Sequence, residues 1–288
     1  DRMLVEKLGQ PDPEVRYYAI SALKLVSSRA EVFTSLISAL EDECPQIRWF
    51  TAGTIAEVLG NPNIRRKVEA GLAAKAAASL TAHLSDEDFM VRAACASALA
   101  KSKARSAARS LLGLLEDPYA TVRESAAEAL WEYANQRMFK RRVRRCPLEP
   151  NLVVRAHLLY AVAATGHREA AGFLKSVAES EAAIELRIAA LDALARTQDL
   201  QTAVPLLAKQ LDRREAGLTE VLLRIFDRLQ VPPPVEGLVA VLADFERLDD
   251  HSIYLVLRFL SRHKERRAAK PLIEFLGHDL DNSLVKIG

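Results

Sequence analysis

The sequence has little of what β-sheets, disulfide scaffolds and zinc sites require. Only 6% of its 288 residues are aromatic, whereas 50% are hydrophobic and 27% are charged. Strands favour aromatic and β-branched residues, so this composition favours helices. The three cysteines, Cys44, Cys95 and Cys146, are odd in number and far apart in the chain. They argue against a disulfide framework or a zinc site and indicate a reducing compartment.

Other features that the sequence lacks exclude several classes of protein. The sequence has no uninterrupted apolar run near 18 residues and no secretory signal at its start, so it predicts a cytoplasmic protein without membrane insertion. Glycine-rich nucleotide loops are missing, and the six histidines show no metal-ligand spacing. We therefore expect no cofactor, no metal and no enzymatic activity. The net charge is +2, so nucleic-acid binding would depend on local clusters of basic residues.

What the sequence does contain is one pattern repeated nine times. A hydrophobic residue followed by arginine, as in Val15-Arg16, recurs six times and is followed by three drifted copies, Leu218-Thr219, Ile253-Tyr254 and Val285-Lys286. The second residues of successive pairs lie 32, 44, 31, 32, 32, 32, 35 and 32 positions apart. A fixed period in this range is typical of solenoids. The spacing of 44 indicates an insertion at residues 60–71.

Each repeat predicts two helices, a first helix A and a second helix B. The segment "AVPLLAKQLD" is typical of helix A, and "LRIAALDALAR" of helix B. Turns that contain Asp, Glu or Pro separate A from B, and these residues suit the start of a helix because its first N–H groups lack intrahelical partners.

Three segments, "DPEVRYYAISAL", "DPYATVRESAAEAL" and "EPNLVVRAHLLYAV", resemble HEAT repeats of the short bacterial kind found in phycobilisome lyase-like proteins. The resemblance covers nearly the whole chain. It implies an all-α superhelix, a single solenoid over residues 1–288 with about nine helix pairs, of which the terminal pairs are incomplete. Neither end shows the polar-faced cap that closes a solenoid, so we expect the natural protein to extend beyond Gly288.

Counting from the arginine of each hydrophobic-Arg pair as position zero, positions −1, +3, +6, +7 and +10 fall on one side of helix B and are mostly apolar or small. We expect that side in the core. Positions +1, +5 and +8 fall on the opposite side, which lines the concave surface in HEAT-like arrays. The partner-binding residues predicted there are Tyr17, Trp49, Glu124, Glu128, Trp131, Tyr160 and Phe259.

The arginine at position zero lies at the edge of the buried side. An acidic residue recurs six positions before several of these arginines, at Asp42, Asp86, Asp117, Glu149 and Glu181. This spacing predicts a ladder of charges between neighbouring repeats, with a structural role.

The densest positive charge lies in "RMFKRRVRR", in the position of a helix A and therefore on the convex side or an edge. Helix ends explain one or two cations, but this stretch has six in nine residues. We interpret it as a patch for an anionic partner, with an acidic protein segment as first choice and a phosphate backbone as second. Its residues are Arg137, Lys140, Arg141, Arg142, Arg144 and Arg145.

The leading functional prediction is a non-enzymatic scaffold that binds another protein through its concave face. A second hypothesis is a nucleic-acid binder. Trp49, Trp131 and Glu128 resemble the groove tryptophans and acidic catalytic residue of HEAT-like alkylpurine DNA glycosylases, but the densest positive charge is predicted outside the groove. A third hypothesis, a chromophore-lyase-like subunit, rests only on the repeat resemblance.

Overall fold

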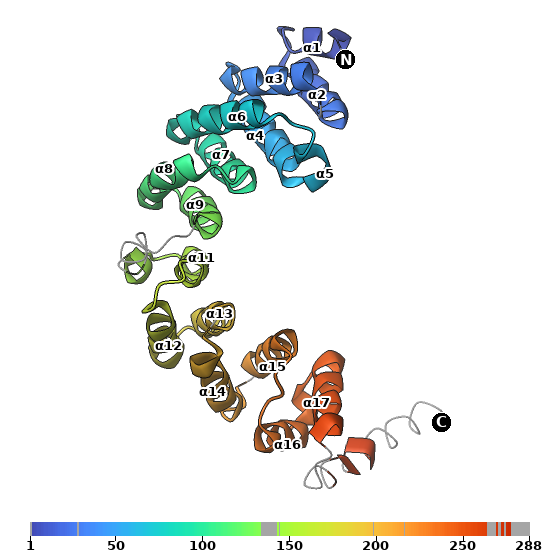
Figure 1. Cartoon of the computed structure of the whole chain (residues 1–288), viewed down its shortest axis with the longest axis vertical. Coiled ribbons are helices and arrows are strands. Elements are labelled where there is room, and N and C mark those ends of the chain that lie inside the picture. Colours follow the sequence, from blue (N-terminus) through green and yellow to red (C-terminus); the bar gives the residue numbers. More distant parts are fainter. Residues whose placement is uncertain are drawn as a thin grey trace. The chain divides into compact units, whose positions relative to one another are not determined.

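The structure, a computed structural model, describes residues 2–27, 29–133, 143, 145–197, 199–215, 217–263, 269, 272–273 and 275–277. Throughout these residues the regular elements are helices, and no strand is present. The all-α prediction is confirmed. The chain divides into two compact units, Asp1–His167 and Arg168–Gly288, each of which is a stack of helix pairs (Figure 1). This division does not test whether residues 1–288 form one solenoid, so the single solenoid stays a prediction.

In the first unit, A and B helices alternate, with one further short helix, α5, in the predicted insertion. Its A helices are α1 (Arg2–Lys7), α3 (Ala30–Ser38), α6 (Ala70–Ala82) and α8 (Ala108–Gly113). Its B helices are α2 (Pro13–Leu23), α4 (Pro45–Gly60), α7 (Phe89–Ser102), α9 (Ala120–Glu132) and α11 (Leu152–Ala163). Helix α5 (Pro62–Arg65) follows α4 directly. The B helices α4, α7, α9 and α11 pack side by side in sequence order, and in Figure 1 α6 and α8 lie on the opposite side from α7 and α9.

The second unit repeats this plan. Its A helices are α12 (Ala170–Ser180), α14 (Leu200–Leu211) and α16 (Val235–Ala243). Its B helices are α13 (Ile184–Ala195), α15 (Leu218–Leu229) and α17 (Asp250–His263). Single 3₁₀ turns connect many of these helices, at Lys24–Val26, Ala39–Glu41, His83–Ser85, Arg105–Ala107, Leu114–Glu116, Cys146–Leu148 and Phe245–Arg247.

The acidic turns start the B helices as the sequence predicts. The side chain of Asp88 accepts hydrogen bonds from the N–H groups of Met90 and Val91, and Asn151 does the same at the start of α11. Pro45 begins α4, where its missing N–H costs nothing because the first N–H groups of a helix have no intrahelical partner. These residues fix where α4, α7 and α11 begin.

The core lies between the two helix layers of each unit. In α13 the predicted core positions Leu186, Ala190, Ala193 and Leu194 are buried, but so are Asp192 and Ala195, which were predicted on the opposite side. Small residues on the B helices allow close approach of their backbones, while larger side chains such as Phe33 of α3 fill the space between the layers. None of the described helices is long and apolar enough to cross a membrane.

Candidate protein-binding face

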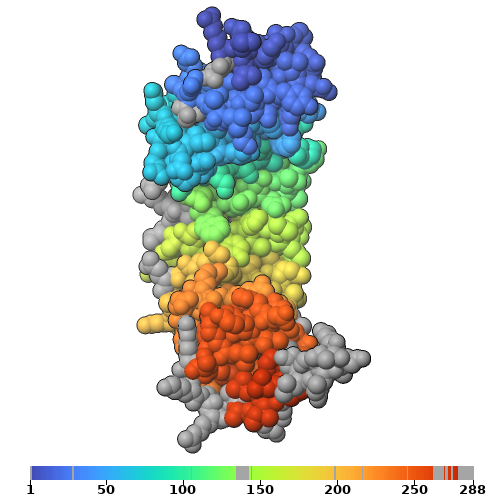
Figure 2. All heavy atoms as spheres, turned by 90° about the vertical axis from the view of Figure 1, so that its right-hand side faces the viewer, coloured from blue at the N-terminus to red at the C-terminus, as the bar shows by residue number. Residues whose placement is uncertain are grey.

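We use the term B-helix face for the surface formed by positions +1, +5 and +8 of the B helices. In the first unit this face carries large side chains that remain accessible to solvent. Tyr17 of α2 is 40% exposed, Trp49 of α4 is 41% exposed and Trp131 of α9 is 40% exposed. Figure 2 views the molecule from the right-hand side of Figure 1, where α7, α9 and α11 lie, and shows the first unit as successive bands in sequence order.

Neighbouring aromatic rings contact two of these side chains, Trp131 and Tyr17. The rings of Trp131 and Tyr160 are stacked with centroids 5.6 Å apart and planes 18° apart. The ring of Tyr17 packs on Phe50 with centroids 4.1 Å apart. Ring pairs at such separations are favourable beyond the area that they bury. The half-buried Tyr160 therefore supports Trp131, and position +5 of one helix contacts position +8 of the helix before it.

The two predicted acidic residues lie on the same helix as Trp131. Glu128 is exposed and Glu124 is half-buried, one and two turns before Trp131 on α9. Helix α9 thus presents an aromatic ring next to negative charge on the B-helix face.

Phe259 is a correction to the predicted set. Its side chain is only 1% exposed and belongs to the core of the second unit, as does Leu255. The eighth repeat lacks the arginine that marks position zero, and the alignment of Tyr254 with that position is one residue too late. One residue is a rotation of 100° on a helix, which turns a core position into a surface position. With Ile253 as zero, Tyr254 takes position +1, and it is 56% exposed.

The B-helix face of the second unit carries several ion pairs. Asp192 of α13 pairs with Arg228 of α15 at 2.6 Å, and Arg224 pairs with Asp249 at 2.9 Å. Arg258 of α17 pairs with Asp227. The first unit also has such a pair on this face, between Lys24 and Glu57, and the second unit also presents an exposed ring, that of Tyr254.

The predicted charge ladder is present in the first unit, and its geometry repeats from one pair to the next. Four arginines, Arg16, Arg48, Arg92 and Arg123, each donate through Nε and Nη2 to the acidic residue at the start of the next repeat, and through Nη1 to two carbonyl oxygens of their own turn. The Nε–oxygen distances are 2.8 Å for Arg16–Asp42, 2.8 Å for Arg48–Asp86, 2.7 Å for Arg92–Asp117 and 3.0 Å for Arg123–Glu149. In the second unit Arg187 pairs with Glu215.

The same carboxylates also organise their own turns. Asp86 accepts the N–H of Asp88, and Glu149 accepts the N–H of Asn151. Burial raises the pKa of the Asp86 carboxyl, but the hydrogen bonds from Arg48 and Asp88 outweigh burial and hold its pKa below the ordinary value of 3.8. Opposing effects of the same kind hold the pKa of Asp117 and of Glu149 below their ordinary values. The ladder therefore stays ionised and connects repeats at their acidic edge.

Only one member of the predicted basic patch lies among the described residues. The Arg145 guanidinium is engaged within the chain: Nη2 donates to the Leu115 carbonyl at 2.8 Å and contacts Glu149 at 3.2 Å. Its side chain is 17% exposed, so it acts as a second cation of the ladder. Arg137, Lys140, Arg141, Arg142 and Arg144 lie outside the described residues.

Comparison with known proteins assigns the repeats to a family. Residues 53–131, from α4 to α9, match the family model of HEAT repeats. This part of the chain therefore consists of HEAT repeats. No curated protein matches it by sequence.

Solved structures show that most of the chain has a known fold. A chain of the complex of CpcE and CpcF of phycocyanin lyase from Nostoc sp. PCC7120 is 22% identical and has a TM-score of 0.51; the alignment covers 91% of this chain and 93% of that one. YibA of E. coli is 17% identical with a TM-score of 0.55, and the coverage is 91% and 92%.

A third structure, in which Kap95p binds RanGDP, contains a chain that is 14% identical with a TM-score of 0.61, and the alignment covers 96% of this chain and 42% of that one. At these identities the similarities establish the fold and leave activity open.

Most of the shifted pKa values belong to residues of the ladder. No group of three or more His, Cys, Asp or Glu placed to hold a metal ion occurs in the part of the chain that the structure describes. Burial raises the pKa of the Cys95 thiol to about 12, which keeps it protonated and unreactive near neutral pH. The pKa shifts thus follow from ion pairs and burial in the stack.

Proposed function

We propose that this protein is a non-enzymatic HEAT-repeat scaffold that binds another protein through the B-helix face of its first unit. The observation that carries the proposal is the set of accessible aromatic rings, Tyr17, Trp49 and Trp131, each about 40% exposed on a face of neighbouring helices. Tryptophan and tyrosine are enriched among the residues that dominate binding energy at protein interfaces.

Two of the exposed rings pack on neighbouring aromatic side chains, and this favours a role in binding over the alternative that the rings are core residues left partly uncovered. Trp131 is stacked on Tyr160, and Tyr17 packs on Phe50, so the rings lose little conformational freedom when a partner covers them. A partner segment that spans α2 to α9 would contact three anchors in a row.

The charge on the same face favours a protein over a nucleic acid. Glu128 is exposed one turn from Trp131, and Glu124 lies one turn further along α9. Carboxylates beside the stacking rings repel a phosphate backbone, which requires a basic surface. The acidic residues instead suit a partner with an apolar segment flanked by lysine or arginine.

The test is quantitative affinity capture from native lysate treated with nuclease, using the intact chain as bait. We compare the wild type with the double variant Trp49→Ala and Trp131→Ala. The matched control is Tyr119→Ala, an aromatic residue of similar exposure, 49%, at the acidic edge and outside the B-helix face. We expect the double variant to lose a defined protein that the wild type and the control retain.

The captured protein is then purified and its affinity measured. Removal of one anchoring tryptophan is expected to weaken binding by about 2 kcal/mol, or about 30-fold. If the double variant is folded and retains every protein that the wild type captures, the aromatic rings do not form the binding face.

A further inference from the structure

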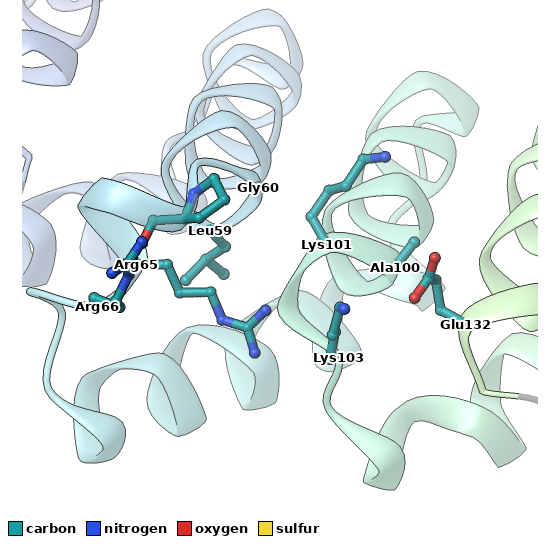
Figure 3. A pocket seen from close by; sticks show the side chains of 9 residues that line it. Leu59, Gly60, Arg65, Arg66, Ala100, Lys101, Lys103 and Glu132 are labelled. Atoms are coloured by element: carbon teal, nitrogen blue, oxygen red, sulfur yellow. Dashed lines mark hydrogen bonds between the residues drawn. The ribbon is translucent and has the colours of Figure 1, made fainter.

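A basic cleft lies at the edge of the B-helix face, where α4 and α7 end. Its volume is about 520 Å³, and Figure 3 shows the side chains that line it. Arg65 and Arg66 come from the region of α5, Lys101 and Lys103 from the end of α7, and Glu132 from the end of α9. Four cations and one carboxylate therefore share one cleft within the first unit.

Two of the cations converge. The Arg65 side chain extends from α5 toward the end of α7, where Lys103 lies (Figure 3). Within the described residues, neither of these two side chains, nor Lys101, has an ion pair with a carboxylate. Like charges that face a shared space with apolar walls create a strong positive potential there. A negatively charged group between them would remove the repulsion.

Lys103 is held in an unusual conformation. It ends α7 with φ 56° and ψ 27°, the left-handed region that glycine usually occupies at the end of a helix. Arg214 and Gln230 are the other non-glycine residues with positive φ among those described. A lysine in this conformation is less favourable than a glycine would be.

The turn that carries Lys103 is fixed from both sides. Ser102 Oγ donates to the Leu99 carbonyl at 2.7 Å and accepts the N–H of Ala104 at 3.2 Å. The hydroxyl of the buried Tyr133 also donates to the Leu99 carbonyl. The backbone position of Lys103 is thus set before any ligand binds.

Apolar contacts shape the rest of the cleft. The aliphatic part of Lys101 passes over Gly60, close enough that a Cβ at Gly60 would lie 3.6 Å from Lys101 Cγ. Leu59 and Ala100, both buried, form its base. Helix ends attract cations because their last carbonyl groups are partly negative, which explains one cation at each end but not four in one cleft.

We propose that this cleft binds an acidic peptide segment, rich in Asp or Glu, of the same protein that the B-helix face takes; this rests on the proposed function. The cleft is continuous with that face, because Ala100 occupies position +8 of α7 and Glu132 directly follows Trp131. Carboxylates pair with its four cations, and the single acidic side chain, Glu132, moderates the positive charge of the cleft.

The experiment uses the intact chain and a fluorescein-labelled hexaglutamate peptide, with hexaglutamine as the uncharged counterpart. Fluorescence anisotropy measures binding at low salt and at about 0.15 M ionic strength, where the Debye length is about 8 Å. We expect the acidic peptide to bind, the neutral peptide not to bind, and the affinity to fall as salt rises.

Lys103→Gly is the decisive variant because it removes a cation and at the same time relieves the strained backbone. We expect it to raise the melting temperature and to weaken peptide binding about threefold to tenfold. Gln230→Gly makes the same backbone change at the end of α15, and Lys175→Ala removes an exposed cation of α12. Both controls are expected to bind the peptide as the wild type does.

Loss of affinity in Lys103→Gly and in Arg65→Gln, but in neither control, supports the cleft. Unchanged affinity in both cleft variants, or equal binding of the neutral peptide, overturns it. Displacement of the peptide by sodium tripolyphosphate at far lower concentration than by unlabelled hexaglutamate also overturns it, since the cleft would then select phosphate groups. Because the peptide does not require the aromatic rings, a negative result here leaves the Trp49 and Trp131 test of the proposed function intact.

Discussion

At the scale of single residues, the arginines at position zero have two functions in the fold. Arg48, for example, neutralises Asp86 of the next repeat and donates 3.0 and 3.1 Å hydrogen bonds to the carbonyl oxygens of Asp42 and Glu43 in its own turn. Lysine would serve poorly here because a single ammonium group cannot contact both sets of acceptors in this planar arrangement.

We predict that Arg48→Ala lowers the free energy of unfolding by about 3 kcal/mol, because it leaves the nearly buried Asp86 without its charge partner. Chemical denaturation measures the change. Arg224→Ala is the control: it breaks an ion pair whose side chains are 52% and 41% exposed, and we expect a loss below about 1 kcal/mol. Equal effects of the two substitutions would contradict a structural ladder.

We predict that acid weakens the fold through the ladder. The pKa values of Asp86, Asp117 and Glu149 are lower in the folded chain than their ordinary values of 3.8, 3.8 and 4.5. The unfolded chain therefore binds more protons just below those values, so the stabilisation is complete above them and is lost as pH falls toward the depressed pKa values.

The urea midpoint at pH 7 and at pH 3 measures this loss. Asp117→Asn should be less stable than the wild type at pH 7 and should lose less stability on acidification, because one of the titrating carboxyl groups is gone. A variant with the same pH dependence as the wild type would show that acid acts elsewhere.

Phe259 and Trp49 show how far a residue's place can be predicted from sequence. Both were predicted on the B-helix face, yet Trp49 is 41% exposed and Phe259 is 1% exposed. The hydrophobic-Arg pair marks the rotation of α4 in the sequence, whereas α17 has lost that arginine, and a shift of one residue rotates a helix by 100°. The exposure of Trp49 was predicted correctly because the hydrophobic-Arg pair gives the rotation of its helix, and not because of its residue type.

This difference predicts opposite effects on stability. We expect Phe259→Ala to lower the free energy of unfolding by about 3 to 5 kcal/mol, the usual cost of removing a buried phenylalanine. Trp49→Ala should cost much less, since its ring already contacts water. Denaturation curves of the two variants decide the matter, and a large loss in Trp49→Ala would assign that ring to the core.

At the scale of elements, the helices begin where the sequence places a capping residue, but the repeats differ in how well they are capped. Asp88 and Asn151 cap α7 and α11 with side-chain hydrogen bonds. The corresponding residue before α13 is Ala183, which has no such side chain, although its backbone angles of −73° and 120° are close to the −84° and 124° of Asp88.

We therefore predict that Ala183→Asp stabilises the chain by about 1 kcal/mol, because the new carboxylate can accept N–H groups at the start of α13. Ala182→Asp places the same charge one residue earlier, outside the capping position, and serves as the control. Thermal or chemical denaturation compares the two; a gain of similar size in both would indicate general electrostatics rather than a cap.

Helix pairs and the ladder could be predicted because both follow from spacing within one repeat. The basic cleft could not, although the sequence shows that Arg65, Lys101 and Lys103 lie in basic connections. Their convergence depends on the insertion that carries α5 and on the left-handed turn at Lys103, neither of which follows from a helical period.

At the scale of the whole molecule, the helix pair is the cooperative unit of a solenoid, because each pair buries its apolar side against its neighbours. The boundary between the two compact units follows this rule. The first ends after α11, a complete B helix, and the second begins with α12 and α13, which pack closely on each other. Residues of α12 such as Leu174 and Ala178 are buried in that unit.

We predict that a fragment of residues 1–167 folds cooperatively and behaves better than the longer fragment 1–180. The longer fragment contains α12 without α13, so the apolar side of α12 faces water. Circular dichroism, size-exclusion chromatography and binding of the dye ANS compare them. Fragment 1–167 should be helical and monomeric with a sharp thermal transition, whereas fragment 1–180 should bind more dye and aggregate. A higher melting temperature and no dye binding in fragment 1–180 would contradict this prediction. The fold would then be stabilised by the addition of single helices rather than of helix pairs.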